Sequence, residues 1–231
     1  MKKIGITLAV VAFAVVAAQA QTTSANIVGY TKATVAGESA DIFGYQLSTG
    51  SGLVSEVVGS SVPVGTKVYT FDGTYAISTL SEVGQNVGFP PVFTVTGTNW
   101  NNDVTIDNGA GFWIQLPAGS SESTAVLAGE VNTAASVTKS VTTGANLLSN
   151  PYPVQMNIDT LFPSAAIGDK IFKFDGSYSS ATYQEVGQNV GFPPVFTVTG
   201  SNWTSNLTIE VGEGFWYLSE EDFDWTVNKP F

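Results

Sequence analysis

Nineteen residues from Glu82 to Trp100, EVGQNVGFPPVFTVTGTNW, recur almost unchanged from Glu185 to Trp203. Thr98, replaced by Ser201, is the one difference between the two stretches. Matches continue at the same offset of 103 residues: GTK at Gly65 is followed by GDK at Gly168. An internal repeat of about 100 residues indicates two copies of one structural unit. We therefore predict repeat units over residues 21–132 and 133–231, joined at Asn132–Ala134, which is too short for a flexible linker and leaves the copies abutting.

The residue pattern within each copy is typical of short strands separated by turns. Val92–Thr96, Val104–Ile106 and Phe112–Leu116 alternate in polarity and are rich in β-branched and aromatic residues. Asp-Gly pairs at Asp72–Gly73 and Asp175–Gly176 lie between such runs and predict type I′ hairpin turns. The pattern predicts an all-β fold of two tandem β-sandwich or jelly-roll-like units. The only helix candidates are single turns over 55–59 and 158–162.

Two prolines follow Phe in each copy, at Pro90–Pro91 and Pro193–Pro194. Proline cannot donate to a central sheet ladder, so these pairs are expected at a sheet edge or a loop entry.

The first twenty residues have the composition of an export signal. Lys2 and Lys3 precede an apolar run, and Ala18-Gln19-Ala20 fits a small-x-small cleavage pattern. We expect a signal peptide over residues 1–20 and an extracellular or cell-surface destination. Its removal would change the formal net charge of −11 to −13.

Composition excludes several classes of function. The chain has no Cys, no His and no Arg, which removes Ser-His and Cys-His nucleophile systems, His general bases and the usual zinc and haem ligands. An acidic chain without Arg repels nucleic-acid phosphates and anionic lipid. We therefore expect no nucleic-acid partner, no membrane insertion, no cofactor and no catalytic or metal site.

The remaining acidic candidates have plain structural explanations. Asp222 and Asp224 are two positions apart on a predicted strand, about 7 Å from each other, within the range of glycosidase carboxylates. The first copy has no equivalent pair, which favours a solvated outer face over a carboxylate-only glycosidase. Glu82 and Glu185 lie beside Gly and Asn, where loop amides would bind them. Asp103 and Asp107 would lie about 13 Å apart on a strand, too far to share one calcium ion.

Several motifs resemble a family of secreted two-repeat β-proteins that is numerous in verrucomicrobial bacteria. The motifs are NLLSNPYP from Asn146, FDGSY from Phe174, GEGFW from Gly212 and the start SANIVGY from Ser24. Similar NPYP/GxGF repeats occur in bacterial cell-surface proteins. The first copy departs from the pattern, with DIFGY from Asp41 in place of the NPYP motif. The resemblance implies an extracellular structural role without catalytic residues.

Two non-enzymatic functions follow as hypotheses. In the first, a secreted or cell-surface structural protein associates with itself or with paralogous surface proteins through sheet edges. The candidate edge is the poorly guarded first strand, whose key residues are Ile27, Val28, Tyr30, Lys32 and Val35. In the second, a carbohydrate-binding module stacks polysaccharide on exposed Trp100 and Trp203. The alternative for both Trp side chains is burial at the end of the sandwich.

Overall fold

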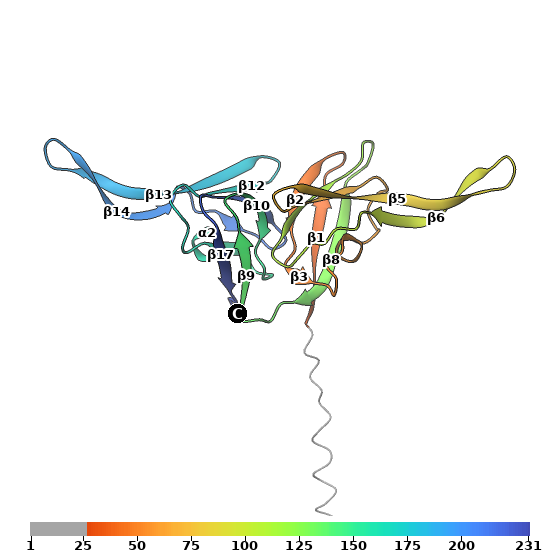
Figure 1. Ribbon diagram of the computed structural model, residues 1–231, viewed down its shortest axis with the longest axis horizontal. Coiled ribbons are helices and arrows are strands. Elements are labelled where there is room, and N and C mark those ends of the chain that lie inside the picture. Colours follow the sequence, from red (N-terminus) through yellow and green to blue (C-terminus); the bar gives the residue numbers. More distant parts are fainter. Residues whose placement is uncertain (1–26) are drawn as a thin grey trace, which may run out of the picture.

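The computed structural model describes residues 27–231 and is all-β (Figure 1). The signal peptide predicted over residues 1–20 lies outside the described residues. The first copy contains eight strands and one helical turn, with these bounds: β1 Val28–Val35, β2 Ala40–Gly44, β3 Leu47–Ser48, α1 Val54–Val57, β4 Lys67–Phe71, β5 Tyr75–Val87, β6 Val92–Asn101, β7 Gly111–Gln115 and β8 Ser123–Val131.

The first strand of the second copy begins at Ser136, and four residues separate it from the end of β8. Its elements are β9 Ser136–Val141, β10 Gly144–Ser149, β11 Met156–Asn157, α2 Ile158–Leu161, β12 Lys170–Phe174, β13 Tyr178–Val190, β14 Val195–Trp203, β15 Thr208–Ile209, β16 Gly214–Ser219 and β17 Phe223–Asn228. Both helices are four residues long, and within residues 27–231 no helix is long and apolar enough to cross a membrane.

Each copy is built on one five-stranded antiparallel sheet. The strand order is β2-β7-β4-β5-β6 in the first copy and β10-β16-β12-β13-β14 in the second. Strand registers also correspond: Phe71 faces Tyr75 across the β4–β5 turn, and Phe174 faces Tyr178 across the β12–β13 turn. The two halves therefore share a sheet plan as well as a sequence pattern.

A smaller sheet covers one face of each five-stranded sheet. In the first copy this layer is β1-β8-β3, and in the second it includes the β9–β17 pair. Alternation along the strands explains the packing: Val68, Phe112 and Ile114 point into the first core, whereas Tyr69 and Trp113 lie on the opposite face. Burying one side chain of this size stabilises the fold by about 1.5–3 kcal/mol.

Two local expectations need correction. Both Asp-Gly pairs lie at hairpin tips as predicted, but only Gly73 and Gly176 have positive φ, so the turns are three-residue loops and not type I′. Residues 104–106 form no strand; Thr105 makes a single bridge to Leu53. The short β15 occupies this place in the second copy because Asn157 and Met156 pair with it.

The two copies meet through a pseudo-two-fold contact made largely by the backbone. Gly44 N donates to Gly212 O at 2.8 Å, and Ser149 N donates to Gly109 O at 3.0 Å. Gly109 and Gly212 occupy equivalent positions in the repeat, so the two bonds are equivalent as well. The five-stranded sheets remain separate sheets, in contact at this seam.

Aromatic rings on the outer faces of the sheets strengthen the seam in the same symmetric way. The ring of Phe71 lies 5.1 Å from Trp216, and the ring of Trp113 lies 5.5 Å from Phe174. The two pairs are equivalent in the repeat: Phe71 corresponds to Phe174, and Trp113 corresponds to Trp216. Edge-to-face and tilted pairs of this kind contribute about 0.5–1.5 kcal/mol beyond the area they bury.

We expect Gly44→Ala to destabilise the protein. A Cβ at this position would collide with the carbonyl oxygen of Glu213 and the Cβ of Ser149, and forced overpacking costs about 1–3 kcal/mol. Gly50→Ala is the matched control, because Gly50 has no heavy atom within 4 Å of an added Cβ. Urea unfolding followed by circular dichroism measures both variants, and equal stabilities would contradict the role of the seam.

Candidate interaction surface

Each five-stranded sheet extends into a long hairpin that leaves the body of the protein. The β5–β6 and β13–β14 hairpins project from opposite ends of the molecule (Figure 1). Strand β4 pairs with β5 only over Tyr75–Thr79, so β5 continues past its inner neighbour. All residues from 82 to 99 are exposed, as are all from 187 to 202. Neither face of either hairpin is covered by another layer of the described chain.

The hairpins carry many apolar side chains despite this exposure. Phe89 and Phe192 lie at the tips and are completely exposed, at 100% and 101%. The other exposed apolar side chains of the hairpins are Val83, Val87, Val92, Phe93 and Val95 in the first copy and Val190, Val195, Phe196 and Val198 in the second. Residues 83–102 and 186–209 contain no charged side chain. Large exposed apolar patches mark interaction sites in soluble proteins.

Both long edges of each hairpin are open. Strand β6 ends the sheet on one side, and β5 has no neighbour besides β6 from Ser81 to Val87 among the described strands. Open edges present unpaired N–H and C=O groups that can accept a further strand. Native proteins usually guard such edges with Lys or other charges; here the one charged residue on the projecting strands of each hairpin is a Glu near its base, Glu82 in β5 and Glu185 in β13.

A β-bulge near the middle shapes each hairpin. The register between β5 and β6 shifts between Val83 and Gly84, and the β13–β14 register shifts at the equivalent position. A side chain at Gly84 would collide with the carbonyl oxygen of Thr94, and the ring of Phe93 lies within about 3 Å of the same position. Gly84 is therefore needed for close pairing, and the Phe93 ring covers the gap left by the missing side chain.

Trp100 and Trp203 anchor the hairpins to the body. They are 4% and 6% exposed, and each belongs to the core cluster of its own copy. Trp100 Nε1 donates to Gly59 O at 2.8 Å, and Trp203 packs edge-on against Tyr183 at 5.3 Å. These rings fill the end of each core where the hairpin leaves it, as in the alternative of burial at the end of the sandwich, and they are not the exposed platforms that the carbohydrate-binding hypothesis requires.

The predicted edge strand lies in β1, at one end of the β1-β8-β3 sheet. Val28 and Tyr30 are strongly exposed, Ile27 and Lys32 are also exposed, but Val35 is buried at 1%. Val35 therefore packs in the first core and cannot contact a partner. Residues 28–35 form an edge, but they lack the length and protrusion of the hairpins.

Three of the carboxylates singled out in the sequence, Asp222, Asp224 and Asp103, form structural contacts. Asp222 accepts from Thr143 N at 2.6 Å and Thr143 Oγ1 at 2.8 Å, and Asp224 accepts from Ser140 Oγ at 3.1 Å. Asp103 accepts from Ser55 N at 2.9 Å, at the start of α1. Within residues 27–231, no three acidic side chains gather in an arrangement that could hold a metal ion.

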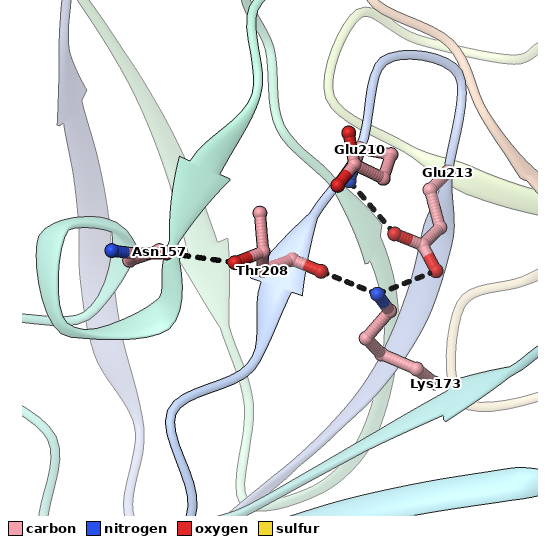
Figure 2. Close-up of polar contacts among 5 residues, drawn as sticks. All are labelled: Asn157, Lys173, Thr208, Glu210 and Glu213. Atoms are coloured by element: carbon pink, nitrogen blue, oxygen red, sulfur yellow. Dashed lines mark hydrogen bonds and ion pairs between the residues drawn. The ribbon is translucent and has the colours of Figure 1, made fainter.

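A polar network beside the seam belongs to the second copy alone (Figure 2). Lys173 Nζ forms an ion pair with Glu213 Oε1 at 2.9 Å and donates to Thr208 O. Glu213 Oε2 in turn accepts from Glu210 N at 2.8 Å. The first copy has Thr70 and Ala110 in place of Lys173 and Glu213. The network therefore fixes the turn before β16, and a function common to both copies cannot depend on it.

Sequence reasoning missed the hairpins as the most exposed feature of the molecule. It recognised the repeated stretch but assigned its possible function to the Trp at its end. The available signal was the uncharged run of twenty residues that follows Glu82. This run covers the end of β5, the tip and β6, so most of the projecting hairpin has no charged side chain to present to water.

Asp222→Asn should lower stability at neutral pH. The hydrogen bonds from Thr143 N and Oγ1 hold the pKa of the Asp222 carboxyl below its usual value of 3.8. A lowered pKa in the folded state means that the stabilisation is present above 3.8 and is lost as pH falls through the folded-state value. Urea unfolding of Asp222→Asn and wild type should differ at pH 7 and converge in acid; a constant difference would contradict this role.

Gly84→Ala should loosen the first hairpin and leave the body intact. The added Cβ collides with Thr94 O, whereas the matched change Gly97→Ala places a Cβ no closer than 3.8 Å to Val83. Hydrogen exchange should show faster exchange of hairpin amides in Gly84→Ala alone, with the core amides unchanged. Equal exchange in both variants would show that the bulge does not require glycine.

Comparison with known proteins gives no family assignment: no protein-family model, curated protein or solved structure matches this chain. Its function has to be inferred from the geometry of the hairpins.

Proposed function

We propose that this protein is a non-enzymatic structural protein that is exported and connects macromolecules at the cell surface through its two hairpins. One observation carries the proposal. Two nearly identical and exposed hairpins, each uncharged beyond Glu82 or Glu185, extend from opposite ends of one body (Figure 1). A molecule with two equivalent contacts can link two partners.

The distribution of differences between the copies supports an external contact. Several positions in the body have diverged, as at Leu80 and Tyr183 or Thr70 and Lys173. The hairpin positions make few internal contacts, yet eighteen of the nineteen residues from Glu82 to Trp100 recur. Internal packing does not account for this identity, but a shared requirement for the same external partner does.

The energetics also favour a partner. An isolated two-stranded hairpin is marginally stable in water, because it has no second layer to bury its side chains. Burying a Val or Phe side chain at a contact contributes about 1.5–3 kcal/mol before the entropic cost of association. Each hairpin exposes at least four such side chains. Association therefore stabilises the part of the molecule that the fold leaves uncovered.

Export and a surface location rest on the composition of residues 1–20. The absence of Cys, His and Arg from the sequence supports a non-enzymatic role. The carbohydrate-binding alternative loses its basis, because Trp100 and Trp203 are buried.

Photo-crosslinking in cells that produce the protein tests the proposal. A photoreactive phenylalanine analogue at Phe89 or Phe192 should form cross-links to a macromolecular partner, because both rings are completely exposed. Tyr30, exposed at 73% on β1, is the matched control for an aromatic residue on an ordinary sheet edge. Cross-links from Tyr30 without any from Phe89 and Phe192 would place the contact on β1 and contradict the proposal.

A further inference from the structure

We infer that the partner of each hairpin is a hairpin of a second copy of this chain, and that the pairing produces linear polymers. This inference rests on the proposed function and specifies its partner. The contact is antiparallel addition of β6 or β14 to the free edge of β6 or β14 in a neighbouring molecule. The near identity of the two hairpins makes all combinations of these edges equivalent.

Open backbone edges distinguish a strand partner from a lipid partner. Alternate residues of β6 point N–H and C=O groups away from β5, and no described strand pairs with them. Hydrocarbon leaves such groups without hydrogen-bond partners, which is costly in a bilayer. Another strand satisfies them, as in β-strand addition. The apolar side chains of the hairpin then pack in the same contact.

Charge directs the contact between copies to the hairpins. The chain carries a formal net charge of −11, so the bodies of two molecules repel each other. Residues 83–102 and 186–209 are the long uncharged segments of the two sheets, and the hairpins hold them away from the acidic body. Two copies that meet through their hairpins therefore experience the least electrostatic repulsion between their bodies. Added salt screens the remaining repulsion and should strengthen the contact.

The side-chain pattern selects a register. When two β6 strands pair antiparallel about Thr94, Phe93 of each strand lies opposite Val95 of the other. Aromatic and β-branched residues facing each other are favourable cross-strand pairs. If the pair were centred on Phe93, Val95 would lie opposite Pro91. If it were centred on Val95, Phe93 would lie opposite Gly97. Centring on Thr94, or on Thr197 in the second copy, pairs the most apolar residues.

The arrangement of the hairpins determines the form of the assembly. A contact between two equivalent edges is isologous, so each β6 or β14 edge is fully used by one partner. Because the two hairpins project from opposite ends of the molecule, the second hairpin remains free for another copy (Figure 1). The assembly therefore grows as an open chain and does not close as a dimer.

Charged substitutions at the centre of the register test this inference on the purified protein. Thr94→Lys and Thr197→Lys are exposed changes that place two like charges opposite each other in the pair. The matched control, Thr74→Lys with Ser177→Lys, adds the same charges at exposed turns away from both hairpins. Circular dichroism and the fluorescence of the buried Trp100 and Trp203 verify folding.

Light scattering coupled to size-exclusion chromatography should give a distinct result for each protein. Wild type and the turn control should form a concentration-dependent series of oligomers that lengthens with salt. Thr94→Lys alone should stop at dimers, since one hairpin remains usable, and the double Lys variant should be monomeric. A wild type that stays monomeric at every concentration, or a single variant that still forms long oligomers, would overturn the inference.

A charge-swap mixture tests the register directly. The Thr94→Glu/Thr197→Glu protein should be monomeric alone, and mixing it with the double Lys variant should restore oligomers through opposite charges. Mixtures that remain monomeric would refute pairing about Thr94 and Thr197. Wild-type monomers that sediment with phosphatidylcholine vesicles would show a lipid contact in place of a second copy. If Phe89 and Phe192 cross-link to another macromolecule in cells while the purified protein remains monomeric, the proposed function stands and the second-copy partner is refuted.

Discussion

The backbone contact across the seam determines how the rest of the molecule is arranged. Gly44 N bonds Gly212 O, and Ser149 N bonds Gly109 O, so each copy holds the other through equivalent atoms. The close approach depends on glycine at Gly44, because a side chain there would collide with the facing strand. Since this contact relates the copies by a pseudo-two-fold axis, a feature present in both copies appears twice, and directions perpendicular to the axis are reversed. The outward direction of the two hairpins follows from it.

Each copy separates the residues that hold the fold from those that face solvent. The core combines two sheets with buried Trp100 or Trp203 at the root of the hairpin. Beyond the Trp side chain, the chain continues as the two-stranded hairpin, which no other layer covers. The anchor allows an intrinsically marginal hairpin to extend from a stable body. Apart from Thr98, which is Ser201 in the second copy, the differences between the copies lie in the body, as the Lys173–Glu213 ion pair does, and leave the hairpin unchanged.

The composition of this chain limits the kinds of catalytic and ligand-binding chemistry that its side chains can perform. Without His, Cys or Arg, the polar groups that remain are mostly carboxylates, amides and hydroxyls. The carboxylates with described contacts cap a helical turn, join strands or fix turns, as Asp103, Asp222 and Glu213 do. Their hydrogen bonds are therefore part of the fold. The exposed apolar side chains of the hairpins are not buried within the molecule, so they contribute no burial free energy to the fold. The functional proposals concern the hairpins for this reason.

Sequence alone determined the all-β class, the hairpin positions of Asp72–Gly73 and Asp175–Gly176, and the two short helical turns, because strand alternation and turn chemistry are local properties. It also excluded His- and Cys-dependent chemistry through composition. Exposure depends on which elements cover a residue, and only the tertiary structure decided it. A Trp followed by Asn is compatible with a sugar platform or a core anchor, and the packing of Trp100 against its own core made it an anchor. The sequence showed that residues 82–100 recur; only the fold, in which β4 begins at Lys67 opposite Thr79 while β5 runs on to Val87, left that repeated stretch uncovered.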